Sequence, residues 1–232
     1  MMRARAGLWA AIFFVAGGLA QADPSFEPRL QALEPTIGHY PADIRDKADA
    51  AAVKARYEAL KRDLDKALAA HPGDEKLLAQ RGRLQSMGHN FDYPRAWDGA
   101  TRDLTAALRK APDDVDALLA LADLWVNSRP DLAGKAENLY RAAQCVVGDK
   151  PLEPAQRGLF FSFYYQGKVH DARRQADFLR RTWPDVALYR TLLDIAAKGS
   201  GGEAAGGEAS AGKGVSPEPA QVALTSCQEK TP

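Results

Sequence analysis

Residues 110–144 read KAPDDVDALLALADLWVNSRPDLAGKAENLYRAAQ, and this stretch decides the fold class. Apolar residues recur in both of its halves at helical intervals, which is the spacing of one buried helix face. Residues 127–134 separate the halves, and Pro112 stands just before the first half. Proline ends one helix and sets the turn into the next. The stretch therefore predicts two antiparallel helices and no strand.

The pattern of the second helix recurs along the chain. Two apolar residues four positions apart are followed by a third and then by a proline, which in one copy is displaced to Pro151. This recurrence resembles the tetratricopeptide repeat (TPR), a unit of about 34 residues that folds as two antiparallel helices. The copies are Leu60, Leu64, Ala67 and Pro72; Ala100, Leu104, Ala107 and Pro112; Ala136, Tyr140 and Ala143; and Ala172, Ala176, Leu179 and Pro184.

The first helix of the repeat is also similar to the TPR pattern. In the preceding repeat, Arg81 and Gln85 depart from it, whereas Leu78 and Gly82 match. The resemblance implies an all-α fold, a TPR-type α-solenoid of about three to four helix pairs over residues 46–197. Residues 185–197 are expected to form a C-terminal capping helix. The middle repeat matches at Leu118, Leu121, Ala122 and Trp125.

Small residues are expected where helices of one repeat approach closely. A bulky substitution there should overpack the interface and cost about 1–3 kcal/mol. The positions are Gly82, Ala100, Ala122 and Ala136.

Both ends of the chain differ from the array in composition. Residues 1–22 join a basic start to a short apolar run and a small-residue motif, which predicts a cleavable signal peptide and a periplasmic or secreted protein. Residues 23–45 are rich in proline and are expected to be irregular. Residues 198–232 are rich in Gly, Ala, Ser and Glu, which predicts a flexible tail whose removal leaves stability nearly unchanged.

The two cysteines, Cys145 and Cys227, leave two interpretations open. In an oxidising compartment they can form one disulfide. The position of Cys145 on an apolar helix face favours instead a buried thiol with an incidental thiol in the tail.

Motifs for catalysis or metal binding are absent from the sequence. The four histidines, His39, His71, His89 and His170, are scattered, and neither cysteine forms a C-x-x-C motif. No phosphate-binding loop, nucleophile elbow or H-E-x-x-H motif occurs. Thirty-one basic residues against thirty acidic ones give no field that favours nucleic acid or an anionic membrane. We therefore expect no enzyme activity, no cofactor and no stable membrane insertion after signal cleavage.

The TPR resemblance implies a concave surface that binds extended or helical peptides. The surface lacks the Lys and Asn set with which some TPR domains hold a C-terminal carboxylate. We expect Arg83, Asp123, Arg157 and Phe161 to mediate binding, although the aromatic residues can also pack against the capping helix. The repeat register places eight candidates on this surface: Lys76, Arg83, Asp116, Asp123, Asn127, Arg157, Phe161 and Tyr164.

Residues 110–144 and the last repeat are also similar to the TPR domain of haem-lyase subunits in bacterial cytochrome c maturation. That resemblance implies an assembly chaperone or scaffold for envelope or redox proteins. The alternative is a structural adaptor in a secretion, pilus or peptidoglycan complex. The sequence does not identify the partner or the oligomeric state.

Overall fold

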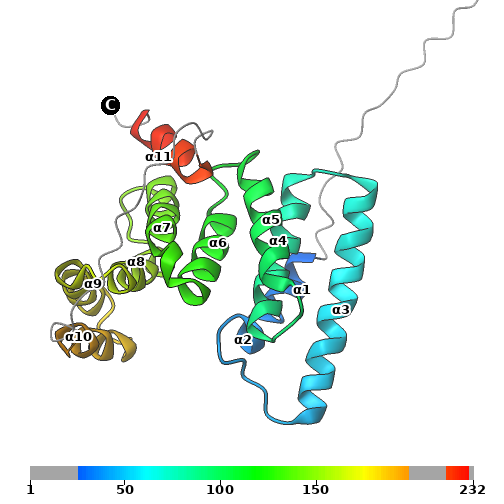
Figure 1. Ribbon diagram of the computed structural model, residues 1–232, viewed down its shortest axis with the longest axis horizontal. Helices are drawn as coiled ribbons and strands as arrows, with labels where there is room; N and C mark the ends of the chain where they lie inside the picture. The colour runs from blue at the N-terminus through cyan, green and yellow to red at the C-terminus, as the bar shows by residue number, and fades with distance from the viewer. Residues whose placement is uncertain (1–25, 199–217, 230–232) are drawn as a thin grey trace, which may run out of the picture.

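The computed structural model describes residues 26–198 and 218–229, and every element in these ranges is helical (Figure 1). The predicted signal peptide and residues 199–217 of the predicted tail lie outside the described residues. The elements are α1 (Phe26–Gln31), α2 (Glu34–Ile37), α3 (Lys47–Ala70), α4 (Glu75–Asn90), α5 (Ala96–Leu108), α6 (Val115–Ser128), the 3-10 helix η1 (Pro130–Leu132), α7 (Ala133–Val147), α8 (Glu153–Tyr165), α9 (Val169–Thr182), α10 (Leu188–Lys198) and α11 (Pro219–Glu229).

Aspartates start the three longest helices of the array's first half. Asp46, Asp74 and Asp114 each accept a hydrogen bond from a backbone N–H in the first turn of α3, α4 and α6. A capping oxygen satisfies an N–H that has no partner within the helix, and its charge complements the helix dipole. The local sequence therefore fixes where these helices begin.

Helices that follow one another in the chain pack against one another from α3 to α10. In addition, α4 contacts α6, and α6 contacts α8. These three alternate helices therefore lie along one side of the molecule, which we call the α4–α6–α8 face. The expected all-α fold is confirmed, and α10 covers most of the predicted capping helix.

The small residues of the repeat pattern are buried, and Gly82 lies at a close approach of two helices. Ala100, Ala122 and Ala136 are fully buried. A Cβ atom built on Gly82 would lie 2.6 Å from Cγ of Leu104 on α5, far closer than real Cβ contacts. The approach of α4 to α5 therefore requires a glycine at this position.

The departures from the repeat pattern at Arg81 and Gln85 have a structural explanation. Arg81 donates two hydrogen bonds to the carboxylate of Asp103 on α5, at 2.6 and 3.1 Å, and Gln85 donates a third at 2.7 Å. The Asp103 side chain is only 2% exposed. Burial opposes its charge, but the hydrogen bonds from Arg81 and Arg102 hold the pKa of Asp103 below its usual value. A polar cluster thus replaces apolar packing between α4 and α5.

The N-terminal segment was predicted to be irregular, and in its described part this holds only for residues 38–45. Its first described residues form α1 and α2, and four of its apolar side chains are buried against α3 and α4: Phe26, Leu30, Leu33 and Ile37. Pro28 and Pro35 fall in the first turns of the two helices, where a missing N–H breaks no helical hydrogen bond. The prolines therefore divide the segment into two short helices without preventing either.

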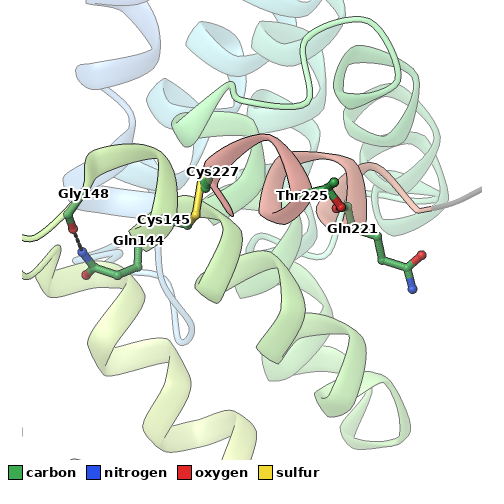
Figure 2. The surroundings of a disulfide bond; sticks show 6 residues. All are labelled: Gln144, Cys145, Gly148, Gln221, Thr225 and Cys227. Atoms are coloured by element: carbon green, nitrogen blue, oxygen red, sulfur yellow. Dashed lines mark hydrogen bonds between the residues drawn. A yellow bond between two sulfur atoms is a disulfide. The ribbon is translucent and has the colours of Figure 1, made fainter. Parts of the chain in front are cut away.

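The C-terminal residues also differ from the prediction, because α11 is folded and lies against α7 (Figure 1). Ala220 and Ala223 are buried in this contact, and Lys135 pairs with Glu218 at 3.1 Å. Figure 2 shows the disulfide between Cys145 on α7 and Cys227 on α11, whose Cα atoms lie 5.8 Å apart. The favoured interpretation of two free thiols is therefore wrong. A cross-link between distant parts of the chain holds a helix whose own apolar face is small.

Candidate functional site

A cavity of about 740 Å³ opens on the α4–α6–α8 face, and we call it the α6–α8 cavity. Its walls come from the second half of α6, from α8 and from the end of α4. The loop at residues 38–40, which follows α2, closes one side. The N-terminal segment therefore contributes to the cavity as well as to the core.

A tyrosine–carboxyl pair forms part of the lining. The hydroxyl of Tyr140 on α7 donates a hydrogen bond to Oδ1 of Asp123 on α6. The ring of Tyr140 passes directly over Gly158 on α8, where any Cβ atom would collide with it. The absence of a side chain at Gly158 is therefore what lets Tyr140 reach across to Asp123.

The electrostatics of this pair follow from its burial. Burial raises the pKa of Asp123, and the hydrogen bond from Tyr140 and the charge of Arg157 offset this only in part. Burial and the neighbouring Asp123 carboxyl raise the pKa of Tyr140 well above its ordinary value. Tyr140 is therefore a neutral donor at physiological pH, and Asp123 gains from any group that stabilises its charge.

Two arginines lie at the cavity, and each already has an acidic partner. Arg157 pairs with Glu153 one turn earlier on α8, at 3.4 Å. Arg129 pairs with Asp131 at 2.8 Å and lies over the ring of Trp97, 5.7 Å from its centroid. Their side chains are about half exposed, so these pairs are accessible to a partner from solvent.

The aromatic run on α8 divides between core and cavity. Phe160 and Phe163 are buried, whereas Phe161 packs on the core and also lines the cavity. Tyr165 lines the cavity and is 43% exposed. Tyr164 stacks on Phe160 and is partly exposed outside the cavity. The run is thus neither wholly core nor wholly a binding surface.

The structure brings four of the eight predicted candidates together: Asp123, Asn127, Arg157 and Phe161 all line the cavity. The other four, Lys76, Arg83, Asp116 and Tyr164, are not among its lining residues.

Arg83 shows why the predicted surface is shorter than expected. Its guanidinium binds Glu27 of α1 at 2.9 Å and lies 3.6 Å from Asp116. The N-terminal segment thus occupies part of the surface that the repeat register left open at the α4 end, while Lys76 stays exposed beside it.

Several cavity residues were missed by sequence reasoning. His39 and Tyr40 belong to the segment predicted to be irregular, and Trp97 opens α5 after a loop. Tyr140 was assigned to the core by the repeat register, and it is fully buried. Its role could have been suspected only from the pairing of a large aromatic at 140 with a glycine at 158.

No protein-family model, curated protein or solved structure matches this chain. Within residues 26–198 and 218–229, no three His, Cys, Asp or Glu side chains are grouped so that they could hold a metal ion. None of the described helices is long and apolar enough to cross a bilayer.

Proposed function

We propose that the chain is an exported protein-binding module of TPR type that holds a segment of a partner protein in the α6–α8 cavity. The observation that carries the proposal is that Asp123, Asn127, Arg157 and Phe161, four of the eight residues assigned to one surface by the repeat register, all line one cavity. A cavity with aromatic walls and a few polar groups is typical of recognition sites. The proposal assigns the chain no catalytic step and no cofactor.

The repeat assignment is supported by the registered pattern and by the packing. Alternate helices α4, α6 and α8 contact one another, as the first helices of stacked repeats do. The small residues of the pattern lie at close helix crossings. These features favour a stacked array of helix pairs.

Export is supported by two independent features. The first 22 residues have the charge and apolar pattern of a signal peptide. The Cys145–Cys227 disulfide favours an oxidising compartment such as the periplasm.

Within this function we propose an assembly chaperone or scaffold for envelope or redox proteins. A role in c-type cytochrome maturation rests only on the resemblance of residues 110–144 and the last repeat, and apocytochrome c is the probe that tests it. A chaperone should bind isolated peptides of its clients, whereas an adaptor should co-purify with one stable folded complex.

Site-directed photo-crosslinking tests where the partner binds. A photoreactive phenylalanine analogue replaces Tyr165 at the cavity or, as a matched control, Arg173 on the exposed side of α9. We expect a specific protein, identified by mass spectrometry, to cross-link at position 165 and not at position 173. Cross-links at position 173 alone would show that the partner uses another surface.

A further inference from the structure

The charges around the α6–α8 cavity are unbalanced. Asp92 and Asp123 line it, while Glu153 and Asp131 stand beside its two arginines. Four carboxyl groups thus face two guanidinium groups, and each guanidinium already has an acidic partner. The cavity therefore complements a cation better than an anion.

The two lining carboxyl groups have unused acceptors. The hydrogen bond from Tyr140 goes to Oδ1 of Asp123, and among the described residues no side chain donates to Oδ2. Among the described residues, Asp92 has no basic partner within ion-pair distance. Asp92 is exposed, whereas burial disfavours the charged form of Asp123, so Asp123 is the carboxyl group that gains most when a cation pairs with it.

Aromatic rings also line the cavity. Trp97, Phe161 and Tyr165 line it, and Arg129 already lies over the face of Trp97. Aromatic faces attract ammonium and guanidinium groups, so these rings favour the same class of ligand as the carboxyl groups do. The volume of about 740 Å³ exceeds one side chain and has room for adjoining backbone.

We propose that the α6–α8 cavity binds a lysine or arginine side chain of an extended peptide, with Asp123 as the ion-pair acceptor and Phe161 and Tyr165 beside the alkyl stem. This inference rests on the proposed protein-binding function and names the chemistry of the partner. It also implies that an acidic peptide is excluded, because it would face Asp92 and Asp123 without a free cation.

Three fluorescein-labelled peptides test the inference by fluorescence anisotropy at low salt. They are short, capped at both ends and identical except at one repeated position, which holds lysine, norleucine or glutamate. We expect the lysine peptide to bind about tenfold more tightly than the norleucine peptide, and the glutamate peptide not to bind. Asp123→Asn should remove the preference for lysine and leave norleucine binding unchanged. The matched control Asp113→Asn, at an exposed carboxylate before α6, should keep the preference.

An NMR readout shows whether the peptide enters this cavity. The indole N–H signal of Trp97 should shift with the lysine peptide, while that of Trp183, which packs near α10, should not. This measurement uses the unmodified protein, so it stands even if Asp123→Asn fails to fold.

Two outcomes overturn the inference in distinguishable ways. If norleucine or glutamate binds as tightly as lysine and shifts Trp97, the cationic preference is wrong and protein binding at the cavity stands. If no peptide shifts the indole signal of Trp97 and position 165 gives no cross-link, both the cationic preference and the proposed protein binding at the cavity are wrong.

Discussion

The disulfide between α7 and α11 offers the most quantitative prediction. It closes a loop with a sequence separation of 82 residues between Cys145 and Cys227. Besides this link, Ala220, Ala223 and Leu224 pack α11 against the core, and Lys135 pairs with Glu218. Reduction should therefore release much of what fixes α11 on α7.

The magnitude follows from the loop length. The chain-entropy treatment gives about 4.5 kcal/mol of stabilisation for a loop of this size, through the lost freedom of the unfolded chain. Measured disulfides typically contribute about 2–4 kcal/mol, because residual structure and strain reduce the effect. We expect a loss of about 2–4 kcal/mol, which corresponds to a fall of about 5–15 °C in Tm for a protein of this size.

The assay is urea unfolding followed by circular dichroism, with and without dithiothreitol. The double variant Cys145→Ser/Cys227→Ser is the matched control, since it should unfold like the reduced wild type and show no response to dithiothreitol. Removal of all residues after Lys198 should lower the free energy of unfolding by about as much as reduction does. Removal of a flexible tail would instead leave it nearly unchanged. A change below about 0.5 kcal/mol in the free energy of unfolding on reduction would show that the disulfide does not stabilise the fold, because surface substitutions alone cause changes of that size.

Three further predictions concern packing and buried charge. Gly158→Ala should lower the free energy of unfolding in urea by about 1–3 kcal/mol, because the added Cβ atom collides with the Tyr140 ring. Gly134→Ala is the control and should change stability by less than about 0.5 kcal/mol, because the nearest neighbour of its Cβ atom is a flexible glutamine side chain. Equal effects of the two variants would contradict the close approach of Tyr140 to Gly158. Asp103→Ala should cost about 1–3 kcal/mol, since the partly buried Arg81 guanidinium loses one of its two acidic partners and keeps Asp65, and a loss under about 0.5 kcal/mol in the same assay would refute a stabilising polar cluster. Because the pKa of Asp123 is raised in the folded state, its protonated form stabilises the wild type fully below the ordinary Asp pKa, and this stability is lost as pH rises through the folded pKa. Asn does not titrate, so Asp123→Asn should become more stable relative to wild type as pH rises above about 4. A constant difference in the free energy of unfolding from pH 3 to about 8 would show that burial does not raise this pKa.

Local signals in the sequence predicted the helices well. Asp74 and Asp114 are capping residues just before apolar periodic segments, and Pro112 and Pro184 follow helix ends, so short-range chemistry marks the starts of α4 and α6 and the ends of α5 and α9. Gly82 marks a close approach of α4 to α5, because only a residue without a side chain fits there.

Long-range contacts explain what the sequence did not predict. Phe26 and Leu30 belong to short helices that are stable only because α3 and α4 cover them, and short isolated helices are marginal in water. The docking of α11 depends on a cross-link to Cys145, far away in the chain. The repeat register assigned Asp123 and Arg157 to one surface, and both line the α6–α8 cavity, but it could not show that Arg83 pairs with Glu27 of α1.

The central claim is that a partner protein binds in the α6–α8 cavity. The direct measurement is the Kd of the cross-linked partner, by isothermal titration calorimetry, for wild type and for Tyr165→Ala. The Tyr165 side chain is 43% exposed, so its loss should leave Tm nearly unchanged. The matched control is Val186→Ala, at an exposed position outside the cavity. We expect Kd to rise about 30-fold or more for the cavity variant, as for loss of a binding hot spot, and to stay unchanged for the control. An unchanged Kd for a folded cavity variant would contradict binding in the α6–α8 cavity.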